Sequence, residues 1–328
     1  MESSGSEAMI RLTGVGKTYE DGTVAVHELD LTVERGELVV LVGPSGCGKS
    51  TTLKMINRLI EPTTGRIEID GQDVTDQDPV ELRRSIGYVI QQVGLFPHQK
   101  ITANVMTVPL LYGESKATAR ERANHLLELV GLDPATYGDR YPHQLSGGQR
   151  QRVGVARALA ADPPVLLMDE PFGAVDPVVR VRLQDEFLRL QRDLGKTVVL
   201  VTHDIDEAVR MGDRVAVFAT GGRLAQFATP VALLARPADD FVADFVGSER
   251  GLRRLQVTPI DEAHLEPLDG VRAGELGAAI DLDSTLEQAL AAMLRDDKAM
   301  IGVKDGAKFV GVLTPNGVHR ALRASLAE

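Results

Sequence analysis

The segment Gly43–Ser50, "GPSGCGKS", carries residues suited to holding the phosphates of a nucleotide. It fits the pattern G-x-x-x-x-G-K-[ST], in which glycines let backbone N–H groups wrap the α- and β-phosphates. Lys49 can reach the β- and γ-phosphates, the Ser50 hydroxyl can bind Mg²⁺, and Thr51 can contact the α-phosphate. The alternative is a glycine-rich turn with a surface lysine. Since an apolar strand precedes the loop and a helical pattern follows it, we predict a nucleotide site that also includes Gly43, Ser45, Gly46, Cys47 and Gly48.

Two further apolar strands end in side chains that could act on the same phosphates. Asp169 and Glu170 follow "VLLM", and His203 follows "TVVLVT". Asp169 suits a water-mediated contact to Mg²⁺, and Glu170 can polarise a water molecule against the γ-phosphate. We place His203 at the γ-phosphate, although an isolated histidine is more often structural. Strands often end in acidic residues, so this interpretation depends on the glycine-rich loop elsewhere in the chain.

A second phosphate-binding feature lies much later in the chain, in "LSGGQRQR", residues 145–152. Ser146, Gly147, Gly148 and Gln149 stand at the start of a predicted helix. Free backbone N–H groups and the helix dipole at such an end attract anions. One chain therefore has two predicted phosphate sites that are far apart in sequence.

The elements that must position these residues alternate between strand and helix. Residues 9–43 read as several strands with turns at Asp21-Gly22 and Arg35-Gly36. The helix after the glycine-rich loop is predicted to run through "TLKMINRLI", where Leu53, Ile56 and Ile60 recur at helical spacing. Residues from about 96 to 161 are predicted to be mostly helical. Strands that alternate with helices favour a mainly parallel sheet, with the functional residues at the carboxyl ends of its strands.

The pattern changes near Gly247, where "VGSERGLRRLQVTP" is predicted to be a linker. The remaining residues predict a small βαββα unit, with a capping box at Ser284 and Glu287 and with Pro315 in the first turn of the last helix. Residues 251–328 hold nine Lys or Arg and twelve Asp or Glu, a net charge of −3. This acidic balance argues against a polybasic membrane sensor.

Composition narrows the class of protein further. The 328 residues are 43% hydrophobic and 25% charged, with a formal net charge of −11. That charge disfavours a sequence-independent nucleic-acid binder and broad adhesion to anionic lipid. The single cysteine, Cys47, excludes an intrachain disulfide and fits a reducing cytosol. The start of the chain, "MESSGSEAMI", does not read as a secretory signal, and the apolar runs are too short to span a bilayer.

Five motifs in order resemble the ATP-binding subunits of ABC transporters: "GPSGCGKST", "LSGGQRQR", "LLMDEP", "AVDP" and "VTHD". The resemblance covers residues from about 9 to 246. It implies a P-loop NTPase core with a mainly parallel sheet, an N-terminal antiparallel β-subdomain and an inserted helical subdomain. It further implies ATP hydrolysis with Mg²⁺ in a head-to-tail dimer, in which each nucleotide lies between the glycine-rich loop of one chain and Ser146–Gln149 of the other.

The same resemblance assigns several other positions. Tyr19 matches the aromatic residue that stacks on adenine, although an ordinary strand tyrosine is the alternative. Gln91 matches the glutamine that meets Mg²⁺ and the attacking water, and the adjacent Gln92 leaves that choice slightly ambiguous. Asp176, in "AVDP", matches the loop that contacts the partner subunit. The stretch around Leu95-Phe96 matches the segment that binds the membrane permease subunits. The alternative is that these two side chains are buried in the core.

The stretches "IGYVIQQVGLFPH" and "FVADFVGSERGLRRL" are most similar to the branch that imports glycine betaine, choline or carnitine, and the βαββα unit resembles one CBS module. We predict a cassette at 8–246 and a regulatory or dimerisation module at 252–328. Residues 252–280 could be the remnant of a second module. The chain would work at the cytoplasmic face of the cell membrane, bound to permease subunits that a substrate-binding protein serves. An amino-acid importer remains an alternative, as does, less favoured, a non-transport ATPase of DNA repair or translation.

Overall fold

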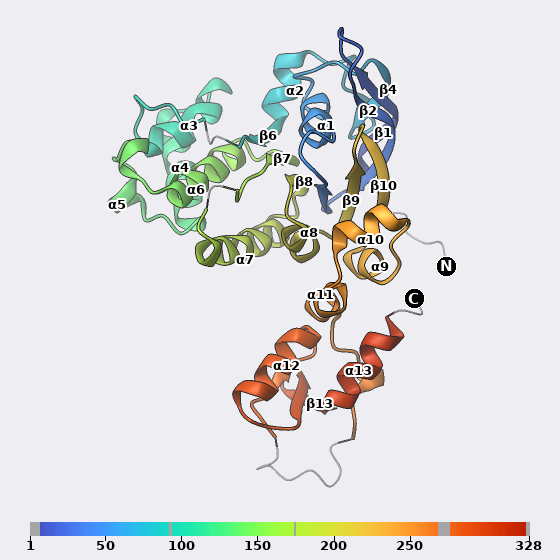
Figure 1. Ribbon diagram of the computed structural model, residues 1–328. Coiled ribbons are helices and arrows are strands. Elements are labelled where there is room, and N and C mark those ends of the chain that lie inside the picture. Colours follow the sequence, from blue (N-terminus) through green and yellow to red (C-terminus); the bar gives the residue numbers. More distant parts are fainter. Residues whose placement is uncertain (1–6, 92–93, 174, 268–275, 326–328) are drawn as a thin grey trace. The chain divides into compact units, whose positions relative to one another are not determined.

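The computed structural model describes residues 7–91, 94–173, 175–267 and 276–325 (Figure 1). The chain divides into two compact units, one of residues 1–204 with 216–224 and the other of residues 205–215 with 225–328. The division runs through β9 (Arg214–Ala219) and β10 (Arg223–Ala228) rather than near Gly247. The assignment of 8–246 and 252–328 as separate domains therefore stays a prediction.

The first unit begins with an antiparallel sheet, as predicted. Its strands are β1 (Ala8–Thr18), β2 (Val24–Glu34), β4 (Thr64–Ile69) and β5 (Gln72–Asp73), in the order β2-β1-β4-β5. Leu12 of β1 lies opposite Leu31 of β2 on one side and Ile67 of β4 on the other. All three side chains are buried, so the alternating pattern of the sequence sets the register of the pairing.

A second sheet has the order β10-β9-β3-β8-β7-β6. Its parallel strands are β3 (Leu38–Val42), β8 (Thr197–Thr202), β7 (Val165–Asp169) and β6 (Ile86–Val89). Every residue of β3, β7 and β8 is buried, as expected of strands that are covered on both faces.

The parallel direction of these four strands determines where the predicted chemistry gathers. The glycine-rich loop follows β3, Glu170 follows β7, His203 follows β8, and Gln91 lies shortly after β6. Because the carboxyl ends of parallel strands meet at one edge of a sheet, these segments share that edge.

Helix α1 (Lys49–Ile56) packs against β7 and β8. Leu53 and Ile56 are fully buried, but the helix ends before Ile60, because Arg58 adopts a left-handed φ of 47°. The prediction of a helix through Ile60 is therefore wrong by about one turn. Helix α2 (Pro79–Ser85) follows, and the Asp78 side chain accepts hydrogen bonds from two N–H groups at its start.

The predicted helical region is confirmed. Helices α3 (Ile101–Leu111), α4 (Lys116–Leu129) and α6 (Gly147–Leu159) pack against one another, and α6 also packs against β6. The short helices α5 (Pro134–Tyr137) and η1 (Pro142–Gln144) lie between α4 and α6 in the chain. Figure 1 shows this group on the side of the sheet where β6 and β7 lie, away from α1. Helix α7 (Pro177–Leu194) then leads to β8.

The second unit contains α8 (Ile205–Met211), α9 (Pro230–Ala235), α10 (Asp240–Val246) and α11 (Arg250–Val257). The linker prediction is wrong, because α11 occupies most of that stretch. Leu255 of α11 joins the apolar core of the C-terminal residues, and Arg254 donates hydrogen bonds to Leu322 O and Ser325 Oγ. Helix α11 is thus an integral part of this unit.

The predicted βαββα order is confirmed. It consists of β11 (Ile280–Asp281), α12 (Leu286–Arg295), β12 (Ile301–Asp305), β13 (Lys308–Leu313) and α13 (Pro315–Ala324). The sheet order is β11-β12-β13, with β11 parallel and β13 antiparallel to β12. Pro315 opens α13 as predicted.

The capping box of α12 lies one residue later than predicted. Thr285 and Gln288 form it, with each side chain bonding to the other's backbone N–H, rather than Ser284 and Glu287. Both spacings fit the sequence pattern, so only the position of the first helical residue separates them.

The stretch 252–280, considered as the remnant of a second module, contributes to the same core. Leu255, Ile260 and Leu265 pack there, the short helix η2 (Glu262–His264) precedes β11, and Glu266 bridges to Val312 of β13. Its described residues form no second βαββα unit, and residues 268–275 lie outside the described part. Among the described residues, no helix combines the length and the apolar character needed to cross a bilayer.

Candidate active site

The glycine-rich loop owes its shape to glycines that no other residue could replace without strain. Gly48 has a φ of 94°, and a Cβ atom there would lie 2.2 Å from the carbonyl oxygen of Ala25. A Cβ on Gly43 would lie 2.3 Å from the carbonyl oxygen of Phe218. Left-handed backbone and close backbone neighbours therefore both require glycine, and the loop is held tightly against β2 and β9.

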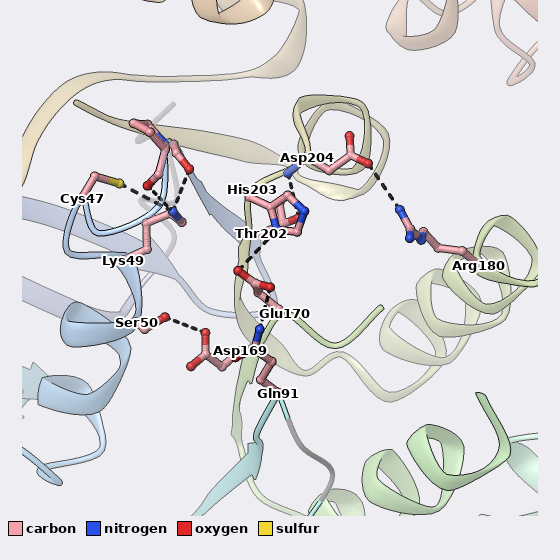
Figure 2. Close-up of polar contacts among 12 residues, drawn as sticks. Cys47, Lys49, Ser50, Gln91, Asp169, Glu170, Arg180, Thr202, His203 and Asp204 are labelled. Carbon is pink, nitrogen blue, oxygen red and sulfur yellow. Dashed lines mark hydrogen bonds and ion pairs between the residues drawn. The ribbon is translucent and has the colours of Figure 1, made fainter. Parts of the chain in front are cut away.

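Lys49 is the charge at the centre of this loop. Its Nζ donates to the carbonyl oxygens of Gly43 at 2.7 Å and Pro44 at 2.9 Å, and it lies 3.6 Å from the Cys47 sulfur (Figure 2). Lys49 is 6% exposed and Cys47 only 1%. Two carbonyl groups hold the ammonium inside the loop, with Ser45 and Gly46 exposed beside it, so a phosphate bound by the loop would lie near a positive charge.

Ser50 and Asp169 come together from different elements. The Ser50 hydroxyl donates to Asp169 Oδ1 at 2.8 Å, which joins the start of α1 to the end of β7. A hydroxyl and a carboxylate are oxygen ligands of the kind that Mg²⁺ accepts, and this ion is usually completed by substrate phosphates and water. The pair therefore fits the metal that the sequence predicts, although the described residues contain no cluster of three or more His, Cys, Asp or Glu able to hold an ion without a nucleotide.

Glu170 contacts the two other predicted catalytic residues. Its Oε2 accepts a hydrogen bond from Gln91 Nε2 at 2.9 Å, and its Oε1 lies 3.3 Å from His203 Nδ1 (Figure 2). These three side chains come from the ends of β6, β7 and β8. The structure thus brings together the residues that the sequence assigned to water and to the γ-phosphate.

The backbone of Glu170 has a feature that the sequence did not predict. Its φ is 46°, in the left-handed region that non-glycine residues seldom occupy, while its N–H donates to Val201 O at 2.9 Å. Strained backbone of this kind persists where the surrounding structure enforces it, and it clusters at functional sites. The turn directs the carboxylate of Glu170 toward Gln91 and His203, whereas Asp169 remains in register with the sheet.

Tyr88, in β6, is a neighbour of the site that the sequence did not predict. Burial and, to a lesser extent, the negative charge of Asp169 raise the pKa of its hydroxyl to about 12. The phenol therefore stays neutral over the ordinary pH range. The stretch "IGYV" does not predict a hydroxyl group near the site, because any aromatic residue at position 88 would fit this strand pattern.

The start of α6 is capped rather than bare. The Ser146 hydroxyl accepts a hydrogen bond from the Gln149 N–H at 3.2 Å, and Gln149 Oε1 accepts one from the Ser146 N–H at 2.9 Å. Gln149 Nε2 also donates to the Tyr137 hydroxyl. This S-x-x-Q spacing of a capping box is a feature that the sequence prediction did not include. It uses the N–H groups of Ser146 and Gln149, so free N–H groups at this end stay a prediction for Gly147 and Gly148. Gly147 and Gly148 complete this first turn, which the described hydrogen bonds do not join to the Gly43–Thr51 loop.

The remaining predicted residues are exposed or half-buried. Tyr19 is 40% exposed, with the Lys17 ammonium 5.5 Å from its ring centroid, and it belongs to the turn that joins β1 to β2. Asp176 is exposed just before α7, and Thr51 is half-buried in α1. Phe96 is also exposed, so the alternative of burial in the core is wrong for this residue. Gln92 lies outside the described residues.

The fold and these side chains define a P-loop nucleotide-hydrolysing protein, because a phosphate loop, a Ser–Asp pair and a strand-end glutamate occupy one sheet edge. The sequence pattern of the family described as "ABC transporter" matches residues 26–173. The glycine betaine/carnitine/choline transport ATP-binding protein OpuCA of Bacillus subtilis is 51% identical, over 87% of this chain and 72% of the relative. The glycine betaine uptake system ATP-binding protein YehX of Escherichia coli is 49% identical, over 86% of this chain and 89% of the relative.

A solved structure agrees with these relatives. The dimeric post-hydrolysis state of the ATP-binding cassette MJ0796, bound to ADP and Pi, is 38% identical with a TM-score of 0.62, and it matches 68% of this chain and 99% of that chain. The chain therefore belongs to the ATP-binding proteins of ABC transporters, and it is an ATPase.

Proposed function

We propose that this chain powers the import of a quaternary-amine osmoprotectant, such as glycine betaine, choline or carnitine, through separate membrane permease subunits. The observation that carries the proposal is the contact of Glu170 with both Gln91 and His203, in a chain whose relatives at 49–51% identity are named for transport of these solutes. The chain would act at the cytoplasmic face of the membrane, with a substrate-binding protein supplying the solute.

In the proposed reaction, backbone N–H groups of the glycine-rich loop and the Lys49 ammonium hold the phosphates. Ser50 and Asp169 would hold Mg²⁺, directly or through water, and that ion would neutralise charge on the phosphates. Glu170 accepts a proton from the attacking water, Gln91 helps to place that water, and His203 contacts the γ-phosphate. The Glu170–Gln91 and Glu170–His203 contacts support this division of roles, because they fix the carboxylate from two sides.

The proposed dimer answers why one chain has two phosphate-binding features. Ser146, Gly147 and Gly148 at the start of α6 would face the nucleotide of the partner subunit, and Asp176 would contact that subunit. The described hydrogen bonds of Ser146 and Gln149 lie within the start of α6 and reach Tyr137 of α5, but none of them joins the Gly43–Thr51 loop, which agrees with a site that is completed by a second copy.

The exposed aromatic side chain of Phe96 supports docking on a permease. Phe96 is 38% exposed, and its backbone N–H and C=O are both bound by the side chain of the fully buried Asn104. Leu110 and Leu111 at the end of α3 are exposed as well. Asn104 thus holds the loop in a shape that presents Phe96 to solvent, where a membrane subunit could cover it.

The C-terminal βαββα unit is proposed to be a CBS-like regulatory module. Arg253 of α11 pairs with Asp206 in the first turn of α8, with Nη2 and Oδ2 3.2 Å apart, and α8 begins two residues after His203 in the chain. This pairing offers a route by which a change in the module could reach the catalytic segment. One such change would be the pairing of two modules in the dimer, with an adenine nucleotide bound between them.

The identity of the transported solute is tested by deleting the gene and measuring the uptake of labelled glycine betaine, choline and carnitine. Loss of uptake of at least one of the three is expected, with recovery from the wild-type gene but not from a Glu170→Gln gene. With 4% aromatic residues and no tryptophan, this chain is poorly suited to build an aromatic cage, so selectivity should follow the other subunits. Normal uptake of all three solutes together with loss of an amino acid would support the amino-acid importer instead.

A further inference from the structure

We infer that Arg180 is a positioning residue for ATP hydrolysis, because it joins the loop that carries Asp176 to the segment that carries His203. Arg180 lies in the first turn of α7. Its Nη2 donates to the carbonyl oxygen of Val175 at 3.2 Å. Its Nη1 lies 3.5 Å from Asp204 Oδ2, and Figure 2 draws this second contact. Asp204 directly follows His203.

Both ends of this bridge lead to catalytic side chains. On one side, the Val175 N–H donates to the Phe172 carbonyl oxygen at 3.3 Å, and the Gly173 N–H donates to the Glu170 carbonyl oxygen at 3.2 Å. These bonds join Val175 to the turn that follows Glu170. On the other side, the Asp204 N–H donates to the Thr202 hydroxyl at 3.1 Å, which fixes the bend around His203. Arg180 therefore holds together the two turns whose side chains meet as Glu170 and His203.

The geometry is that of a positioning contact rather than of a strong stabilising one. The Arg180 and Asp204 side chains are 26% and 33% exposed, and an ion pair that solvent reaches adds little to stability. The buried Arg180 Nε has no hydrogen-bond partner among the described residues, which is unfavourable for folding. What the guanidinium provides is two donors in a rigid plane, and a lysine ammonium cannot reproduce that arrangement.

The expected effect of Arg180 on ATP hydrolysis rests on the proposed function. Asp176 stands beside Val175, and Asp176 is the residue proposed to contact the partner subunit. Arg180 would transmit that contact to His203, so that the partner would stabilise the placement of the catalytic side chains that this chain already brings together. Loss of Arg180 should then slow the chemical step while the phosphate-binding loop, which Arg180 does not touch, keeps its affinity for ATP.

The experiment compares ATP hydrolysis by Arg180→Lys, Arg180→Gln and Asp204→Asn with the wild type. We expect kcat to fall by about 10- to 100-fold in Arg180→Gln, since misplacement by an ångström can produce a loss of this size, with KM for ATP changed less than threefold. Arg180→Lys keeps the positive charge but not the two donors of the planar guanidinium, so its kcat should stay close to that of Arg180→Gln. The double variant Arg180→Gln/Asp204→Asn should be no slower than the slower single variant. Arg182→Gln is the matched control, because Arg182 lies on the same helix, is 78% exposed and pairs with Glu186.

Assembly is measured separately, in variants that also carry Glu170→Gln. Glu170→Gln and Glu170→Gln/Arg180→Gln should form the ATP-bound dimer equally well in size-exclusion chromatography. A wild-type kcat in Arg180→Gln, full recovery in Arg180→Lys, or loss of the dimer would overturn the inference. If Glu170→Gln alone hydrolyses ATP at the wild-type rate, the proposed function fails instead. A fall in melting temperature of Arg180→Gln that the Lys variant does not share would assign a folding role to the charge and would also contradict the inference.

Discussion

Glu170 Oε1 lies 3.3 Å from His203 Nδ1, although the two residues follow different strands of the parallel sheet. The contact exists because β7 and β8 are neighbours, with Asp169 opposite Val201. The left-handed backbone of Glu170 then places its carboxylate between His203 and Gln91. Two strand ends and one strained residue therefore build the centre of the proposed site.

Glu170 and Lys49 should affect hydrolysis in different ways. Glu170→Gln keeps the phosphate loop but removes the base, so the rate should fall by about 10²- to 10⁴-fold while the ATP-bound dimer accumulates. Lys49→Ala removes the buried charge of the loop and should weaken ATP binding itself. Steady-state ATPase assays and size-exclusion runs with Mg-ATP separate the two effects. Glu61→Gln, which alters an exposed carboxylate paired with Arg58, is the control and should behave as wild type.

Gly48 and Gly46 form a matched pair for testing the shape of the loop. Both have a left-handed φ, 94° and 78°, so alanine at either position carries a similar backbone penalty of about 1–2 kcal/mol. Only at Gly48 would the new Cβ collide with Ala25, whereas at Gly46 it meets open space. Gly48→Ala should therefore lose about 1–3 kcal/mol more stability than Gly46→Ala in urea unfolding. Equal losses would mean that the loop is not packed against β2.

Cys47 should react slowly in the folded protein. Because Cys47 lies inside the phosphate loop, a maleimide on this residue is expected to abolish ATP hydrolysis, and bound ATP is expected to slow the reaction. Since Cys47 is 1% exposed, we now expect native labelling to be far slower than labelling in denaturant, with activity lost in proportion to the label. Mass spectrometry gives a clean stoichiometry, because the chain has no other cysteine. Full native labelling with activity intact would contradict the placement of Cys47 in the phosphate loop, and Cys47→Ala is the unlabelled control.

Removal of the C-terminal module should separate catalysis from regulation. A chain that ends after Gly247 loses α11 and with it the Arg253–Asp206 pair, so we expect ATP hydrolysis to persist but the response of transport to an osmotic shift to change. Full-length Arg253→Gln should reproduce that change, whereas Arg250→Gln on the exposed face of the same helix should not. Analytical ultracentrifugation without ATP tests the dimer role. Identical monomers with a normal osmotic response would assign neither role to the module.

Ionisation of Tyr88 should lower the stability of the folded protein at alkaline pH. Its pKa is raised to about 12 in the folded protein, above the ordinary value of 10.0, so folding favours the protonated phenol. This contribution to stability is complete below pH 10 and is lost as the pH rises toward 12. Tyr88→Phe has no such proton, and its stability should fall less steeply than that of wild type over this range. Parallel unfolding curves for the two proteins between pH 9 and 11.5 would show that Tyr88 is not buried near Asp169.

The sequence by itself determined the elements and most of the site. Apolar runs such as those of β3, β7 and β8 are too regular to be mistaken, and each predicted catalytic residue lies directly after one of these strands or shortly after β6. Strands that alternate with helices favour a parallel sheet, so the sequence alone already places these residues at one shared edge. The βαββα order of the C-terminal residues was equally readable, because helical and alternating patterns succeed one another there without a gap.

Only the tertiary structure decided the contacts and the exceptions. The left-handed φ of Glu170 and the bridge that Arg180 makes between Val175 and Asp204 depend on which loops become neighbours, and no local pattern encodes that. Helix α11 was mistaken for a linker because its apolar residues are few, and it becomes a packed element only when Leu255 meets the C-terminal core. Strand and helix preference is local and visible in the sequence, whereas packing between distant segments is not, since its free energy depends on surfaces that only the folded chain brings together.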